Sequence, residues 1–167
     1  DSIKLNKDQS QYTYGAWAMT LTNATNEIKT NQNLFYGVKD KNHYLLRNSD
    51  DKSLFLAYYE NGLKAANEDE VRSGNDDRHW IFEEVEGQEG VYYMKNVGQK
   101  LYFTELNDGS NALLTSQVGM VKFKLHYNGD GTAYVLNYND QNVSLYVGSN
   151  YSIVGKQPGQ ASSMWLI

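Results

Sequence analysis

The chain has 167 residues, a net charge of −5 and no cysteine, so a disulfide framework and a thiolate metal site are both excluded. Its charges are interspersed along the sequence, and the lack of a basic stripe argues against a nucleic-acid partner. No apolar run approaches the ~18 residues that a membrane-spanning helix needs, and the length suits one domain, or one domain with an extension.

The first 42 residues do not follow the pattern of the rest of the chain. Segments 17–22 and 34–38 are short strand candidates in an otherwise polar stretch. We therefore expect residues 1–42 to form an N-terminal extension or an extra hairpin. Because the chain begins at Asp1 rather than Met, we also expect a processed, secreted form or a trimmed chain.

From residue 43 onward the sequence repeats three times. A lead segment opens each repeat at Tyr44, Tyr92 and Tyr134, which lie 48 and 42 residues apart. A second apolar segment follows each lead segment after a short break, and a closing segment with large apolar residues ends each repeat. The second segments are 53–56, 100–103 and 143–147, and the closing segments are 80–82, 121–123 and 165–167. Periods of this size are typical of symmetric supersecondary units, and three units of four short strands predict a threefold all-β barrel.

Turn signals separate these segments, as a barrel of short strands requires. Asn61-Gly62 is a two-residue hairpin signal, and segments 107–109, 128–131 and 157–159 are rich in Asn, Asp and Gly. The whole pattern resembles the β-trefoil superfamily over residues 43–167, with repeats at about 43–87, 88–130 and 131–167. The resemblance implies a six-stranded barrel capped by hairpins. Its core residues would be Trp80, Phe82, Phe123, Trp165 and Ile167.

No arrangement of residues in the sequence indicates catalysis or a metal. There is no Gly-x-Ser-x-Gly motif, and His43, His79 and His126 are scattered. The acidic segments 48–51 and 75–77 do not have the spacing of a helix-flanked calcium loop, so solvated turns are expected there. We expect a protein that is not an enzyme and that has no catalytic residues, no metal and no cofactor.

Carbohydrate binding is the function that the sequence favours. Sugar sites combine an aromatic face for the C–H surface of the ring with Asp and Asn groups for its hydroxyls. Each repeat offers such residues near its hairpins. The predicted binding residues are Asp50, Tyr58, Tyr59, Asn61, Asn107, Asp108, Asp140, Asn150 and Tyr151. The structural alternative is that these tyrosines fill strands and that these Asn and Asp residues make turns.

The resemblance departs from the ricin-type branch, because no Gln-x-Trp motif is present. Other branches of the superfamily lack that motif, including toxin-binding domains and protease inhibitors. The leading expectation is a secreted lectin-like module that binds glycans weakly at several sites, with avidity between them. The alternative is a protein-binding trefoil, such as a protease inhibitor or the receptor-binding domain of a toxin, whose contacts lie at unique loop tips.

Overall fold

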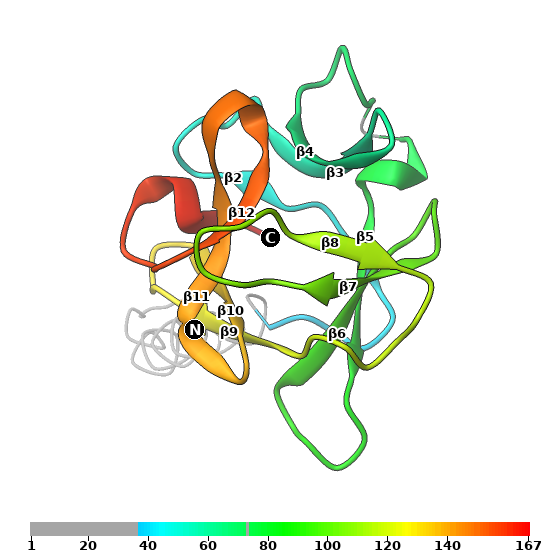
Figure 1. Cartoon of the computed structure of the whole chain (residues 1–167), viewed down its shortest axis with the longest axis vertical. Coiled ribbons are helices and arrows are strands. Elements are labelled where there is room, and N and C mark those ends of the chain that lie inside the picture. The colour runs from blue at the N-terminus through cyan, green and yellow to red at the C-terminus, as the bar shows by residue number, and fades with distance from the viewer. Residues whose placement is uncertain (1–36, 73) are drawn as a thin grey trace, which may run out of the picture. The chain divides into compact units, whose positions relative to one another are not determined.

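The computed structural model describes residues 37–72 and 74–167, and this part of the chain is almost entirely β (Figure 1). The first repeat contains β1 (His43–Tyr44), β2 (Arg47–Asn48), β3 (Phe55–Tyr59), β4 (Gly62–Ala66), the 3-10 turn η1 (Asp76–Arg78) and β5 (Trp80–Glu84). The second contains β6 (Val91–Asn96), β7 (Leu101–Glu105), β8 (Leu113–Thr115) and β9 (Phe123–Tyr127). The third contains β10 (Thr132–Asn137), β11 (Asp140–Val147), η2 (Ser149–Tyr151), β12 (Ile153–Lys156), η3 (Ala161–Ser163) and β13 (Met164–Leu166). None of the helices in this part is long and apolar enough to cross a membrane.

The lead and closing strands of the three repeats form a closed barrel. β1 and β2 are two pieces of one lead strand, and the strand order runs β1-β5-β6-β9-β10-β13-β2. β1 pairs with β5 on one side, and β2 pairs with β13 on the other. The sheet therefore closes on itself and has no open edge among these strands.

The remaining strands form three hairpins, β3–β4, β7–β8 and β11–β12. In Figure 1 these hairpins surround the centre of the view. Each hairpin belongs to one repeat, so the described residues contain the four-strand unit three times. This confirms the threefold β-trefoil that the sequence predicts.

A large aromatic residue from each closing strand fills the core. Trp80, Phe123 and Trp165 are fully buried. The two indole N–H groups donate to carbonyls of the hairpin in the same repeat, Trp80 Nε1 to Leu56 O at 2.9 Å and Trp165 Nε1 to Leu145 O at 3.1 Å. The second repeat has no indole, and there Phe103 occupies the hairpin position and its ring centroid lies 5.1 Å from that of Phe123. Among the other predicted core residues, Phe82 is fully buried and Ile167 packs at the margin of the core.

Strand register corrects one detail of the predicted repeat. Trp80, Phe123 and Trp165 lie opposite Asn96, Asn137 and Asn48, respectively. Counting back from these asparagines, the residue that matches Tyr44 and Tyr92 in the third repeat is Ala133. Tyr134 is therefore one position out of register and stacks on the exposed His126, with ring centroids 5.8 Å apart.

The chain just before the first repeat contacts the barrel. Lys41 N donates to Phe82 O at 3.2 Å, and Glu84 N donates to Asp40 Oδ1 at 2.8 Å. The strand candidate at 17–22 and nearly all of that at 34–38 lie outside the described residues. The predicted division at residue 42 and the predicted bounds of the repeats stay predictions.

Candidate functional site

A cavity of about 370 Å³ lies between the β3–β4 hairpin, the segment that leads into η1, and the turn between β6 and β7. We call it the tyrosine pocket. Its lining residues are Tyr58, Tyr59, Glu60, Asn61, Glu70, Val71, Asn75, Asp77 and Gln99. Three of the predicted binding residues, Tyr58, Tyr59 and Asn61, therefore meet in one place. The cavity falls within the size range of small-molecule sites.

The hairpin geometry brings the two tyrosines to the pocket. Tyr58 and Tyr59 are the last residues of β3, and both are half-buried. Tyr59 packs on a small buried cluster of Ala57, Ala66 and Val71, which fixes one side of its ring. The chain then reverses through Glu60 and Asn61, whose φ values of 52° and 65° are those of a tight hairpin turn.

A buried amide positions the polar side of the pocket. Asn96 is fully buried, and its Nδ2 donates to Asp77 O at 2.9 Å while its Oδ1 accepts from Gln99 N at 2.9 Å. The side chains of these two lining residues also meet, with Gln99 Nε2 donating to Asp77 Oδ1 at 3.0 Å. The Asn96 side chain thus links Asp77 and Gln99, which lie 22 residues apart in sequence. It holds the carboxylate of one beside the amide of the other.

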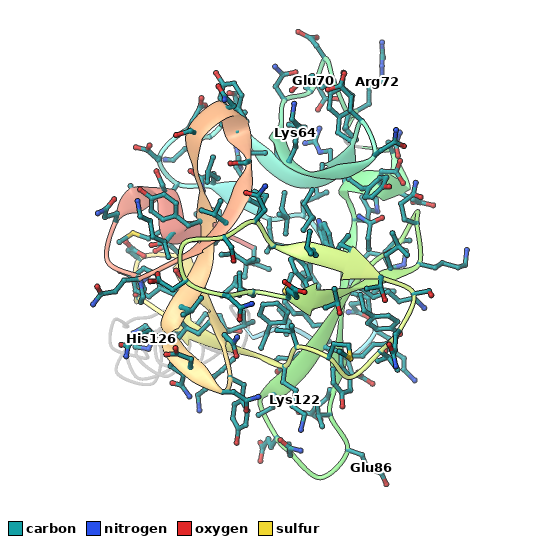
Figure 2. The ribbon with its side chains drawn as sticks, viewed as in Figure 1. Lys64, Glu70, Arg72, Glu86, Lys122 and His126 are labelled. Carbon is teal, nitrogen blue, oxygen red and sulfur yellow. The ribbon has the colours of Figure 1, made fainter. Side chains whose placement is uncertain are left out.

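A buried arginine holds the far wall. Arg78 is 1 % exposed, and its Nη1 donates to Val71 O and, at 2.9 Å, to Glu68 Oε1. Its guanidinium carbon lies 3.6 Å from the centroid of the Phe55 ring. Figure 2 shows the lining residue Glu70 close to Arg72 and to Lys64 of β4, at one end of the described trefoil. The Arg78 side chain thus connects η1 to the segment that carries Glu68 and Val71.

The tyrosine pocket has the chemistry of a polar, hydroxylated ligand site. Tyr58 and Tyr59 supply apolar ring surface and phenolic hydroxyls. The Asp77 carboxylate can accept hydrogen bonds from ligand hydroxyls, and the amides of Gln99 and Asn61 can both donate and accept. Sequence reasoning missed Asp77 and Gln99, because each comes from a segment other than the hairpin and no local motif connects them.

Asp50 lies outside the tyrosine pocket, at the equivalent turn of the first repeat. The buried Asn48 holds this turn just as Asn96 holds the other. Asn48 Nδ2 donates to Ser162 O at 3.0 Å, and Asp50 N donates to Asn48 Oδ1 at 3.1 Å. Asp50 Oδ2 accepts from Ser162 Oγ at 3.0 Å. The structure thus repeats the polar arrangement of the tyrosine pocket there without the hairpin tyrosines.

Asp108 and Asp140 line a second cavity of about 290 Å³, together with Asn142, Val143 and Gln157. This cavity is acidic and has no aromatic residue in its lining. Asn107 does not line it. Its carbonyl instead lies against Gly155, where no Cβ would fit.

Asn150 and Tyr151 lie in η2, at the tip of the β11–β12 hairpin. Both have positive φ, 56° and 61°, and Tyr151 is 57 % exposed. Neither lines any of the cavities described above.

The three hairpins differ two residues after their core positions Leu56, Phe103 and Leu145. This difference explains why only the hairpin of the first repeat forms a pocket with tyrosines. Two residues after these positions stand Tyr58, Glu105 and Val147. The first repeat alone places an aromatic ring there. Tyr151 lies six residues after Leu145 and so does not occupy the position of Tyr58 in its repeat.

Comparison with solved structures identifies the fold. No family model matches the chain, and no curated protein matches its sequence. A ricin B-like lectin of Macrolepiota procera, solved in complex with lactose, superposes with a TM-score of 0.61 at 10% identity over 77% of this chain and 96% of its own. A mosquitocidal holotoxin gives 0.62 at 14% identity over 77% of this chain and 17% of its own. A Clostridium perfringens endo-β-galactosidase that releases GlcNAcα1-4Gal gives 0.62 at 19% identity over 74% and 31%.

Further lectins and a designed threefold-symmetric protein match as well. At these identities the likeness establishes the fold. The barrel, the three hairpins and these neighbours show that the chain has the β-trefoil fold.

Proposed function

We propose that this domain is a non-catalytic carbohydrate-binding module and that its site is the tyrosine pocket. The observation that carries the proposal is the convergence of Tyr58 and Tyr59 with Asp77 and Gln99 around one cavity. A pyranose ring has an apolar C–H face and a rim of hydroxyls, and this pocket offers a partner for each. The lectins among the structural neighbours support the proposal.

We further propose one principal sugar site per chain. The equivalent positions of the other two repeats carry Glu105 and Val147 in place of Tyr58. Binding to a single glycan is then monovalent. This revises the expectation of several sites acting together, and any avidity would have to come from several copies of the chain.

Secretion of the protein stays a prediction.

The test is a glycan array followed by calorimetry with the best-bound glycan. We expect Tyr58→Ala and Asp77→Asn each to lower the affinity at least tenfold, which is about 1.4 kcal/mol. The matched control is Asp50→Asn, since Asp50 lies at the equivalent turn but away from the tyrosines. A folded protein that binds no glycan at millimolar concentration would refute the proposal. Release of free sugar from a bound glycan would refute the proposal that the module is non-catalytic.

A second candidate function, protein binding, rests on a different observation. Leu113, Val118 and Met120 are 47–52 % exposed on the segment from β8 toward β9. Exposed large apolar residues that gather on one segment are typical of contact surfaces. Replacing all three with serine should abolish a protein interaction and leave glycan binding intact. Loss of glycan binding in this triple variant would instead assign the segment to the sugar site.

A further inference from the structure

We propose that His43, Asp76 and His79 form a site for a divalent transition-metal ion, with Zn²⁺ as its simplest occupant. Each residue offers one ligand atom, and these atoms all lie within 4.8 Å of one another. His79 Nδ1 is 3.8 Å from Asp76 Oδ1, and the rings of His43 and His79 have their centroids 5.7 Å apart. The site does not depend on the proposed sugar binding.

The fold brings the three residues together from segments that lie 33 or more residues apart. His43 begins β1 and pairs across the strands with Ile81, so it lies beside the start of β5. His79 directly precedes β5 and caps η1. Asp76 opens the same turn, three residues earlier. The β1–β5 pairing therefore places one imidazole next to a turn that already carries a second imidazole and a carboxylate.

The backbone under these ligands is held firmly. Asp76 O accepts from both His79 N at 3.1 Å and Gly98 N at 3.0 Å. Gly98 packs so closely on this turn that an added Cβ would lie 3.0 Å from the Asp76 carbonyl carbon and 2.9 Å from Asp77 N. A turn that is fixed in this way loses little conformational entropy when it binds an ion.

The ligand set selects the class of metal. Two imidazole nitrogens and one carboxylate oxygen suit Zn²⁺ and its transition-metal neighbours, whereas Ca²⁺ and Mg²⁺ prefer oxygen ligands. Zn²⁺ bonds of about 2.0–2.2 Å in a tetrahedron place ligand atoms about 3.4 Å apart. The present separations, which reach at most 4.8 Å, must therefore shorten by up to about 1.4 Å. His43 and Asp76 are exposed, so their side chains can turn to close this gap. Three protein ligands leave a fourth position for water.

The test uses the full chain without a histidine tag. A tag would itself bind the metal, whereas the sequence has only three histidines of its own. After treatment with a chelator, calorimetry with ZnCl₂ should show one ion per chain. His43→Ala should weaken this binding at least tenfold, as even the loss of residues that support a ligand does in metal sites. Co²⁺ should give the visible absorption of a tetrahedral complex in the wild-type chain and lose it in His79→Gln.

The matched control is His126→Ala. His126 is exposed on β9 and stacks on Tyr134, and Figure 2 shows it at the edge of the described trefoil. This variant should bind Zn²⁺ as the wild type does. Urea unfolding of the metal-free variants reports whether each one is folded. The proposal is overturned if folded His43→Ala binds Zn²⁺ as tightly as the wild type, if His126→Ala weakens binding equally, or if the wild type binds Ca²⁺ but not Zn²⁺.

Discussion

Replacing Asn96 with alanine tests the link between the core and the tyrosine pocket. The side chain of Asn96 is fully buried and makes two hydrogen bonds, to Asp77 O and from Gln99 N. Each bond contributes about 0.5–1.5 kcal/mol net, so Asn96→Ala should lower the free energy of unfolding by about 2 kcal/mol. For a domain of this size the Tm should fall by about 6 °C. Because Asp77 and Gln99 lose their common anchor, glycan affinity should also fall at least tenfold.

Asn48→Ala is the matched control for this prediction. Asn48 is buried to the same degree and makes the same two bonds at the equivalent turn, to Ser162 O and from Asp50 N. We expect the same loss of stability, measured by urea unfolding, and no loss of glycan affinity, measured by calorimetry. Equal losses of affinity in the two variants would refute the reasoning, because the asparagines would then act only through global stability.

Three further predictions concern the core and two titrating groups. Trp80→Phe should cost about 2 kcal/mol of stability, since it leaves a cavity and an unpaired carbonyl on Leu56. Adding Leu56→Phe should recover part of this in urea unfolding, because the pair then matches the second repeat. Burial, assisted by a hydrogen-bonded carboxylate, raises the pKa of Tyr102 from 10.0 to about 12. This contribution to the free energy of unfolding should be complete below pH 10 and lost as the pH rises to 12. Tyr102→Phe should reduce this pH dependence but leave a part of it, because burial also raises the pKa of Tyr127 to about 12. The side-chain hydrogen bond from Thr132 lowers the pKa of Asp130 below 3.8, and Thr132→Val should raise it toward 3.8 in an NMR titration.

The fold could be predicted from the sequence because the repeat and the turns are local signals. Asn61-Gly62 indicates a hairpin, although the two turn residues are Glu60 and Asn61 and Gly62 pairs with Tyr59. The closing aromatics recur at regular spacing. The predicted register of the third lead strand is wrong, because the identity of a tyrosine alone does not determine strand register. Strand pairing instead follows burial, and Ala133 and Val135 face the core while Tyr134 does not. The asparagines opposite the closing aromatics share the observed register in all three repeats.

The residues of the tyrosine pocket could be predicted from the sequence only where they lie on one continuous segment. Tyr58, Tyr59 and Asn61 are near neighbours in sequence, and they also meet in space. Asp77 and Gln99 join them only because β5 pairs with β6 and Asn96 connects the two ends. Asp50, Asn107, Asn150 and Tyr151 resemble the pocket residues in type. The structure places them elsewhere, and a role for them in sugar binding stays untested.

Closure of the barrel has a consequence for the speed of folding. The hairpins pair residues that are close in sequence. In contrast, β2 pairs with β13 only when Asn48 lies opposite Trp165, which is more than 100 residues away in the chain. Bringing distant segments together carries an entropic cost before their contacts can repay it, so chains dominated by such pairings fold slowly. The repeats can thus gain structure early, while the seam between β2 and β13 sets the time at which the barrel becomes a single cooperative unit.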